Sequence, residues 1–140
     1  MRLAYSLLYV SKTLLQFPAG GAEVAKIVEG SLARNANLGV TGALISTGQH
    51  FAQLLEGRQA AVEELMASIS ADPRHMKMKT LRVVEEDRRF PDWALAYSGV
   101  AGLVDRYIAP LFSPLPEKET AHLAMRLVGI VEEFARIPPG

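Results

Sequence analysis

The chain has 140 residues, 49% of them hydrophobic, which is enough for one domain with its own core. Fifteen Lys and Arg balance fifteen Asp and Glu, and no basic cluster forms a stripe, so we expect no nucleic-acid partner. The absence of cysteine excludes disulfides, thiolate nucleophiles and cysteine-bound metals. The N-terminus has neither a signal-peptide pattern nor a membrane-length apolar run, which favours a soluble, cytoplasmic protein.

The first half of the chain alternates strand and helix patterns. Residues 3–11 are typical of a strand with two largely apolar faces, and residues 22–35 of a helix whose inner stripe starts apolar and ends polar. Two strands follow at residues 39–47 and 50–56, joined by a turn at Gly48 and Gln49. An amphipathic helix comes next, over residues 58–70, and the Asp–Pro pair that follows ends it.

The second half adds two strands and two helices. Strand patterns lie around residues 79–87 and 92–98, and helical patterns cover residues 100–112 and 118–137. The order β, α, β, β, α, β predicts an α+β, ferredoxin-like sheet with an added fifth strand and two helices on one face. The C-terminal helices or a partner subunit must then cover the other face. We therefore expect a domain at 1–98 and, at 99–140, a helical extension that packs on the sheet.

One polar side chain stands on a face that should be buried. In the stretch HFAQLLEG, strand alternation puts Gln53 on the same side as Phe51. Burying an amide without a partner costs about 1–3 kcal/mol, so a partner should lie nearby. Tyr9 on the neighbouring strand and Ser31 and Asn35 on the first helix offer polar groups. These groups either satisfy one another in the core or surround a flat polar ligand.

Several other residues can be explained by ordinary structural roles. Trp93 is by default a core or subunit-contact residue, and His75 a residue of a surface or helix end. Arg74 is usually solvated, and the pair Arg88 and Arg89 is most often a solvated turn. No set of Asp, Glu and His has the spacing of a metal site.

Several motifs, taken in order, resemble the BLUF domain, a blue-light sensor that uses FAD. They are YVS, RNANLGVTGAL, HFAQLLEG, the helix ending in DPRH, and RRFPDW. The resemblance runs from about Leu3 to Tyr97, and GVTG followed by FAQLLEG is its most specific part. It implies the same ferredoxin-like fold, with FAD held between the two helices of the domain.

The resemblance also implies which residues form the site. Tyr9 and Gln53 match the family's photoswitch pair, and Asn35 matches an asparagine that hydrogen-bonds the edge of the flavin ring. The remaining cofactor positions are Ile27 and Ser31, which line the ring, the pair Arg74 and His75 beside the flavin, and Arg34, where the family is variable.

Two further residues match the family's fifth strand, where we expect a signalling role. Trp93 matches the family tryptophan, and we assign it no catalytic role. Leu95 stands where many members carry methionine, so the volume is kept while the thioether is lost.

A photocycle in place of enzymatic turnover is what the resemblance implies. Blue light excites the flavin, an electron and a proton leave Tyr9, and the Gln53 amide rearranges before they return. The two ends of an amide have nearly the same shape and opposite hydrogen-bonding roles, so the exchange needs little space. A new hydrogen bond to a flavin carbonyl would then shift the absorption to the red.

The segment after Tyr97 indicates how a light signal would leave the domain. No cyclase, phosphodiesterase or DNA-binding segment is recognisable there, so we expect a short, stand-alone BLUF protein that forms homo-oligomers and signals to a separate protein.

An acylphosphatase-like hydrolase would share the fold, but SKTLLQFPAGG lacks the arginine that its anion loop needs. A light-insensitive interaction or ligand-sensing module stays open, and the colour of the purified protein separates it from a photoreceptor.

Overall fold

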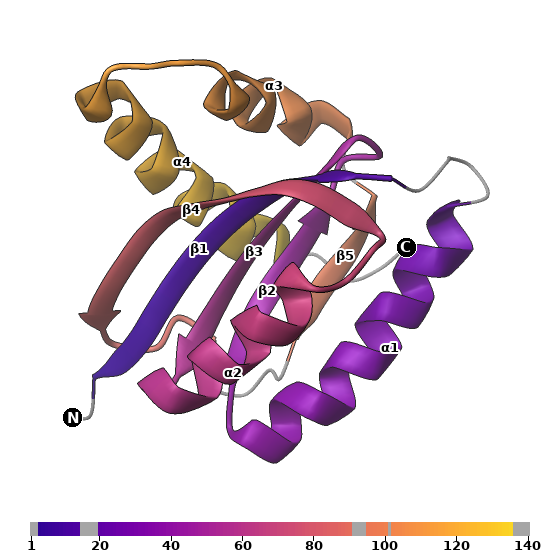
Figure 1. Cartoon of the computed structure of the whole chain (residues 1–140). Coiled ribbons are helices and arrows are strands. Elements are labelled where there is room, and N and C mark those ends of the chain that lie inside the picture. The colour runs from indigo at the N-terminus through magenta and orange to yellow at the C-terminus, as the bar shows by residue number, and fades with distance from the viewer. Residues whose placement is uncertain (1–2, 15–19, 91–94, 101, 136–140) are drawn as a thin grey trace.

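The computed structural model describes residues 3–14, 20–90, 95–100 and 102–135 (Figure 1). In chain order the elements are β1 (Ala4–Thr13), α1 (Gly20–Leu38), β2 (Thr41–Ser46), β3 (His50–Gly57), α2 (Gln59–Ser70), β4 (His75–Glu86), β5 (Ala96–Val100), α3 (Asp105–Ile108) and α4 (Glu117–Ala135). Short 3-10 turns, η1 (Gly102–Val104) and η2 (Ala109–Phe112), flank α3.

One sheet joins the strands of the described ranges, in the order β4-β1-β3-β2-β5. β1 pairs antiparallel with both β3 and β4, and β2 pairs antiparallel with β3. These four strands with their two helices confirm the predicted α+β, ferredoxin-like class. β5 lies at the edge, parallel to β2.

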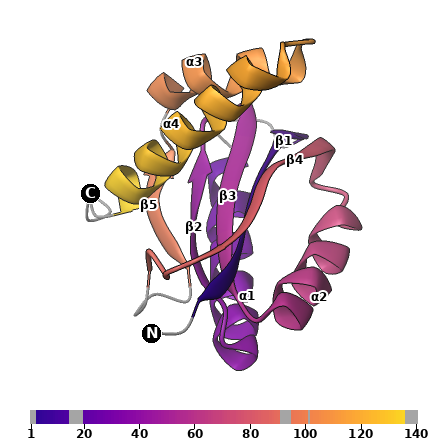
Figure 2. The same ribbon diagram turned by 90° about the vertical axis from the view of Figure 1, so that its left-hand side faces the viewer.

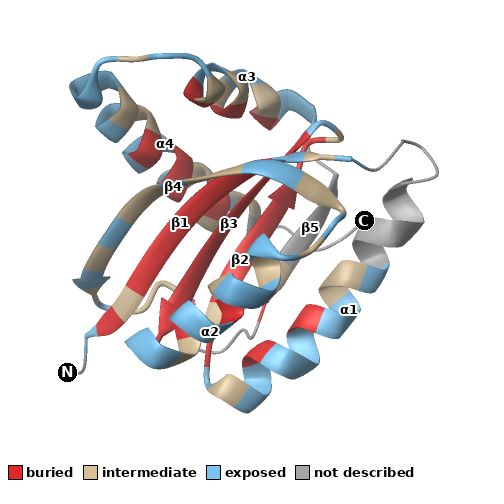
Figure 3. Cartoon of the chain, viewed as in Figure 1, coloured by how far each residue is buried: buried red, intermediate tan, exposed pale blue. Residues whose placement is uncertain are grey.

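Helices cover both faces of the sheet. Figure 2 shows α1 and α2 on one side and α3 and α4 on the other. Because strand side chains alternate, β1 sends Leu8 and Val10 toward the C-terminal helices and Leu7 and Tyr9 toward α2. Both faces of the central strands are therefore buried, as predicted for the first strand (Figure 3). We call η1, α3, η2 and α4 together the cap.

Two glycines set the geometry of the β2–β3 hairpin. Gly48 in the turn has a φ of 95°, a conformation that side chains with a Cβ rarely adopt. At Gly42 a Cβ would lie 2.0 Å from the backbone oxygen of Leu54, so only glycine lets the two strands approach this closely. The predicted turn at Gly48 and Gln49 is thus confirmed.

Some element bounds differ from the predictions. Residues 100–112 were expected to form one helix, but β5 continues to Val100 and only Asp105–Ile108 is α-helical. Pro110 lacks a backbone donor, so a continuous helix cannot run through it. β4 begins at His75, earlier than predicted, because its backbone pairs with the end of β1. Residues 92–94 of the predicted fifth strand lie outside the described residues.

The expectation of a solvated turn at Arg88 and Arg89 is wrong. Glu56 on β3 is fully buried, and its carboxylate accepts hydrogen bonds from the backbone N–H of Arg89 at 2.8 Å and of Phe90 at 2.6 Å. It also accepts the Thr41 hydroxyl at 2.9 Å. The Arg88 guanidinium bonds the Thr41 hydroxyl and the Gly39 carbonyl. The segment after β4 is therefore anchored to β3 by a buried carboxylate, which sequence periodicity does not reveal.

The described ranges contain no helix long and apolar enough to cross a membrane. In the same ranges, no three His, Cys, Asp or Glu side chains gather closely enough to hold a metal ion. The buried polar side chains lie instead on the sheet strands, on the hairpin turn and on α1.

Candidate functional site

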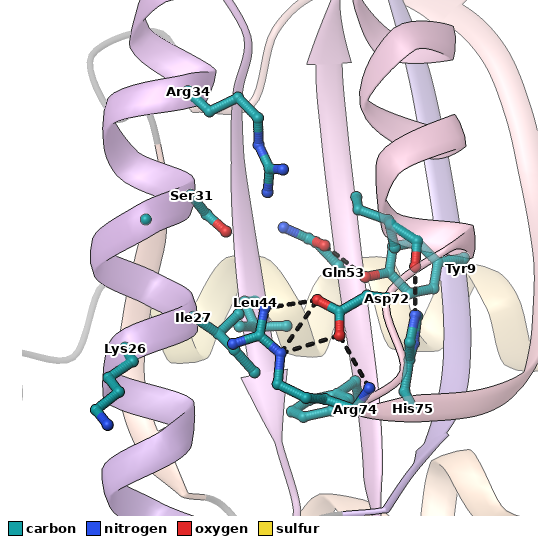
Figure 4. Close-up of a pocket in the computed structure, with 13 residues that line it drawn as sticks. Tyr9, Lys26, Ile27, Ser31, Arg34, Leu44, Gln53, Asp72, Arg74 and His75 are labelled. Atoms are coloured by element: carbon teal, nitrogen blue, oxygen red, sulfur yellow. Dashed lines mark hydrogen bonds and ion pairs between the residues drawn. The ribbon is translucent and has the colours of Figure 1, made fainter.

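A cavity of about 230 Å³ lies over the sheet, between α1 and the segment from the end of α2 to the start of β4 (Figure 4). Strands β1, β2 and β3 form its floor through Tyr9, Leu44, Phe51 and Gln53. The predicted residues Ile27, Ser31, Arg34, Arg74 and His75 also line it. The cavity therefore brings together residues that are as far apart in the sequence as Tyr9 and His75.

Tyr9 and Gln53 form a buried hydrogen-bonded pair at the cavity floor. They are direct register partners on β1 and β3, and they are 4% and 5% exposed. The Tyr9 hydroxyl donates to Gln53 Oε1 at 2.6 Å. Burial raises the pKa of Tyr9 well above its ordinary value, with a smaller contribution from the charge of Asp72. The Tyr9 phenol is therefore protonated, and it is the hydrogen-bond donor of the pair.

The other end of the Gln53 amide is directed away from Tyr9. In Figure 4 its nitrogen points across the cavity toward Ser31, whose hydroxyl extends from α1. Ser31 is buried and lies on the cavity wall. The amide thus holds the phenol with its oxygen and presents a donor to whatever occupies the cavity.

His75 forms a fixed wall beside Tyr9. Its Nε2 lies 2.6 Å from the Ile69 carbonyl oxygen, which can only accept, so the proton is on Nε2. Its Nδ1 lies 2.7 Å from the Ser11 hydroxyl. The ring meets the edges of Tyr9 and Phe51, with centroids 6.3 and 6.4 Å away. With contacts to β1, β3 and α2, this ring has little freedom to move.

Charged groups gather at the rim of the cavity. Arg74 donates to the Asp72 carboxylate from Nε, from Nη2 at 2.6 Å and from its backbone N–H. The hydrogen bond from the Arg74 side chain lowers the pKa of Asp72. Lys26 and Arg34 lie on the α1 side. The rim therefore carries three cationic side chains and one carboxylate.

The remaining predicted residues stand apart from the cavity. Asn35 is 2% exposed and lies one turn beyond Ser31 on α1, but it is not among the lining residues. Leu95 is buried in a cluster with Leu44 and Phe51, but it is not among the lining residues. Trp93 lies outside the described residues.

Six lining residues were missed by the sequence analysis: Lys26, Gly30, Leu44, Phe51, Ile69 and Asp72. Strand alternation carried the signal for Phe51, and hairpin pairing for Leu44, which is directly opposite Gln53. Nothing in the sequence separates Asp72 from an ordinary helix-ending residue, because its role depends on the side-chain direction of Arg74.

The cavity fits a flat heteroaromatic ring with a polar edge and an anionic tail. Ile27, Ile69 and the His75 ring supply apolar and aromatic walls, while Gln53 and Ser31 supply hydrogen-bonding groups for a ring edge. The cationic rim suits phosphate groups. The fold and cavity thus define a ferredoxin-like domain with a cofactor-sized cavity that is lined by a buried Tyr–Gln pair.

Comparison with known proteins identifies the family. The family model described as sensors of blue-light using FAD, BLUF, matches residues 4–96. The dark-state structure of the BLUF protein BlrB has 33% sequence identity and a TM-score of 0.68, and the match covers 93% of this chain and 98% of that chain. The chain belongs to the BLUF family. It is a blue-light photoreceptor domain that binds FAD, and the resemblance found in the sequence is confirmed.

Two relatives carry this domain within longer proteins. The photoactivated adenylate cyclase subunit beta of Euglena longa is 32% identical over 92 residues, which are 64% of this chain. The match spans only 10% of that protein. Klebsiella pneumoniae BlrP1, solved with FMN and cyclic diGMP, is 30% identical with a TM-score of 0.59, over 67% of this chain and 25% of that chain. BLUF domains thus also occur within longer proteins, and the family description calls them sensors of blue light.

Proposed function

We propose that Tyr9 and Gln53 are the photoswitch of this domain. The observation that supports this most directly is the 2.6 Å hydrogen bond from the buried phenol to the amide oxygen, with the amide nitrogen directed into the cavity (Figure 4). A core glutamine would need only the tyrosine. This one has a second polar end facing the space that suits the cofactor.

The chain's own groups can carry out the switch. When bound in the cavity and excited by blue light, FAD would supply a one-electron oxidant. Tyr9 would give up an electron to that oxidant, and its hydroxyl proton would move along the short hydrogen bond toward Gln53 Oε1; both return to Tyr9 once the amide has rearranged. The amide then exchanges the roles of its two ends, so that its donor faces Tyr9 Oη and its acceptor faces the cavity. Burial keeps water from competing for either group.

The surrounding residues would hold FAD and keep the pair aligned. We assign Ile27 and His75 to the ring walls and Ser31 to the ring edge, and we keep Asn35 as a candidate for that edge although it lies one turn beyond the lining residues. Arg34 and Arg74 lie at the rim, where phosphate groups would pass. His75 also keeps Tyr9 in place, because its own two ring nitrogens are both hydrogen-bonded.

The test is the light response of two variants, Tyr9→Phe and Gln53→Leu. Each should bind FAD and lose the reversible red shift, because each removes one end of the switch. The matched control is Tyr5→Phe on the same strand, four residues away and outside the cavity. A normal red shift in either switch variant contradicts the assignment.

The output would be a change of protein contacts. We propose a homodimer or higher homo-oligomer, signalling to a separate downstream protein through the cap, with Leu95 and Trp93 on the route. The support is that Leu95 packs against two cavity-floor residues and directly precedes β5. We also propose the division into a flavin domain at 1–98 and a signalling extension at 99–140, and a cytoplasmic location.

A further inference from the structure

A buried polar cluster lies on the sheet face opposite the cavity. It consists of Thr47 in the hairpin turn, His50 at the start of β3 and Asp105 at the start of α3. His50 is three residues before Gln53, so the two side chains point to opposite faces of β3. The His50 side chain is 6% exposed and that of Asp105 is 25% exposed. The photoswitch proposed above makes no use of this cluster.

The cluster ties the hairpin turn to the cap. The Thr47 hydroxyl accepts from the backbone N–H of His50 at 2.9 Å, which closes the turn, and donates to Asp105 Oδ1 at 2.8 Å. The same carboxylate oxygen accepts from His50 Nδ1. The His50 ring also stacks on Phe112 of η2, with centroids 4.9 Å apart and planes at 23°. One carboxylate of α3 thus holds both ends of the turn.

The strand that begins at His50 also forms the cavity floor. Phe51, the next residue, lines the cavity from the opposite face, and Gln53 follows two residues later. A backbone displacement here must move groups on both faces together, because successive side chains of a strand leave the same backbone in opposite directions. β3 is moreover paired on both edges, so it moves with its neighbours rather than bending alone.

We propose that His50 and Asp105 are positioning residues that couple β3 to α3, so that the rearrangement at Gln53 changes the packing of the cap. This inference rests on the proposed photoswitch. The His50–Asp105 contact is the route by which the rearrangement at Gln53 would reach the cap. The adjoining turn carries Leu103, which is 83% exposed. A displacement of α3 therefore alters an apolar group at the surface, where another protein can meet it.

A second sheet-to-cap contact provides a matched control. Lys79 on β4 donates from Nζ to the Leu111 carbonyl of η2 at 2.8 Å. It holds the same part of the cap but comes from a strand that does not carry Gln53. Loss of this contact should loosen η2 without interrupting the route from β3.

The test is hydrogen exchange of the FAD-loaded protein in the dark and under blue light. In the unaltered protein, light should change exchange in residues 102–112. In Asp105→Ala, dark exchange there should rise by about tenfold or more, because the hydrogen bonds from Thr47 and His50 to the carboxylate are both lost, and the light-induced difference should disappear. The red shift should persist, because the cavity is unchanged. Lys79→Met should also raise dark exchange but keep the light-induced difference.

Three results would overturn the coupling. The first is an Asp105→Ala protein that keeps the full light-induced difference, and the second is an unaltered protein that shifts its absorption without changing exchange in residues 102–112. The third, no red shift at all, would overturn the proposed photoswitch and the coupling with it. If Asp105→Ala does not fold, the same comparison is made with Asp105→Asn, which keeps the shape and removes the charge. Retention of the full light-induced difference in that variant would likewise overturn the coupling.

Discussion

Removing the Tyr9–Gln53 hydrogen bond from each side in turn should have a measurable cost in folding stability. In Gln53→Leu the acceptor of the Tyr9 hydroxyl is lost, and in Tyr9→Phe the donor to Gln53 Oε1 is lost. Both residues are at most 5% exposed, so water replaces the missing partner poorly. A buried polar group left without its partner costs about 1–3 kcal/mol. We expect each single variant to lose about that much free energy of unfolding.

The double variant should be more stable than the sum of the two losses predicts. Replacing both partners by apolar groups leaves neither side unsatisfied, and such a replacement can be nearly neutral. The coupling energy from the double-mutant cycle should therefore be about 1–2 kcal/mol. Urea unfolding of the flavin-free protein in the dark measures it, with Tyr5→Phe as a control for the loss of a tyrosine hydroxyl outside the pair. A coupling energy near zero would refute the pairing.

Three further predictions concern other parts of the fold. Glu56→Ala leaves two buried backbone donors without an acceptor and should lower the free energy of unfolding by about 3–5 kcal/mol, measured by urea unfolding. Gly129→Ala on α4, where a Cβ meets nothing within 4 Å, should raise it by about 0.5–1 kcal/mol, while Gly42→Ala should lower it sharply because the Cβ collides with the neighbouring strand. Stability should also fall in acid. Hydrogen bonds from arginine lower the pKa of Asp72 and Glu86, so their contribution is complete above the ordinary carboxyl pKa of about 4 and is lost as the pH falls through the lowered values.

Each of these has a result that would contradict it. An unchanged unfolding midpoint in Glu56→Ala would mean that the buried carboxylate does not anchor the segment after β4. Equal effects at Gly42 and Gly129 would contradict the close approach of the hairpin strands. For the acid effect, Glu86→Gln is the comparison, and an acid transition as steep as in the unaltered protein would remove Glu86 from the explanation.

Much of the fold could be predicted because its patterns are local. Strand alternation and helical periodicity depend on neighbours a few residues apart, so β1, the hairpin and α2 appear in the sequence with nearly their final bounds. The segment at 100–112 was predicted poorly because its helical pattern competes with Pro110 and with the pairing of β5. The early start of β4 depends on its pairing with β1, which periodicity does not encode.

The site could be predicted in part for a similar reason. Gln53 was noticeable as an amide on an apolar face, and Tyr9 as a phenol on a neighbouring strand; their pairing then follows from register. The roles of Asp72 and Glu56 depend on which way distant side chains point, and no spacing rule contains that information. The same holds for His50, whose partner Asp105 is 55 residues further along the chain.

The most direct test of the central claim is an absorption spectrum of the purified protein with FAD, recorded in the dark, under blue light and again during dark recovery. The account predicts a bound-flavin spectrum that shifts slightly to the red under light and returns in the dark. Bound flavin without a reversible shift would contradict the role of Tyr9 and Gln53. A protein that does not bind FAD even after reconstitution would favour a light-insensitive interaction module on the same fold.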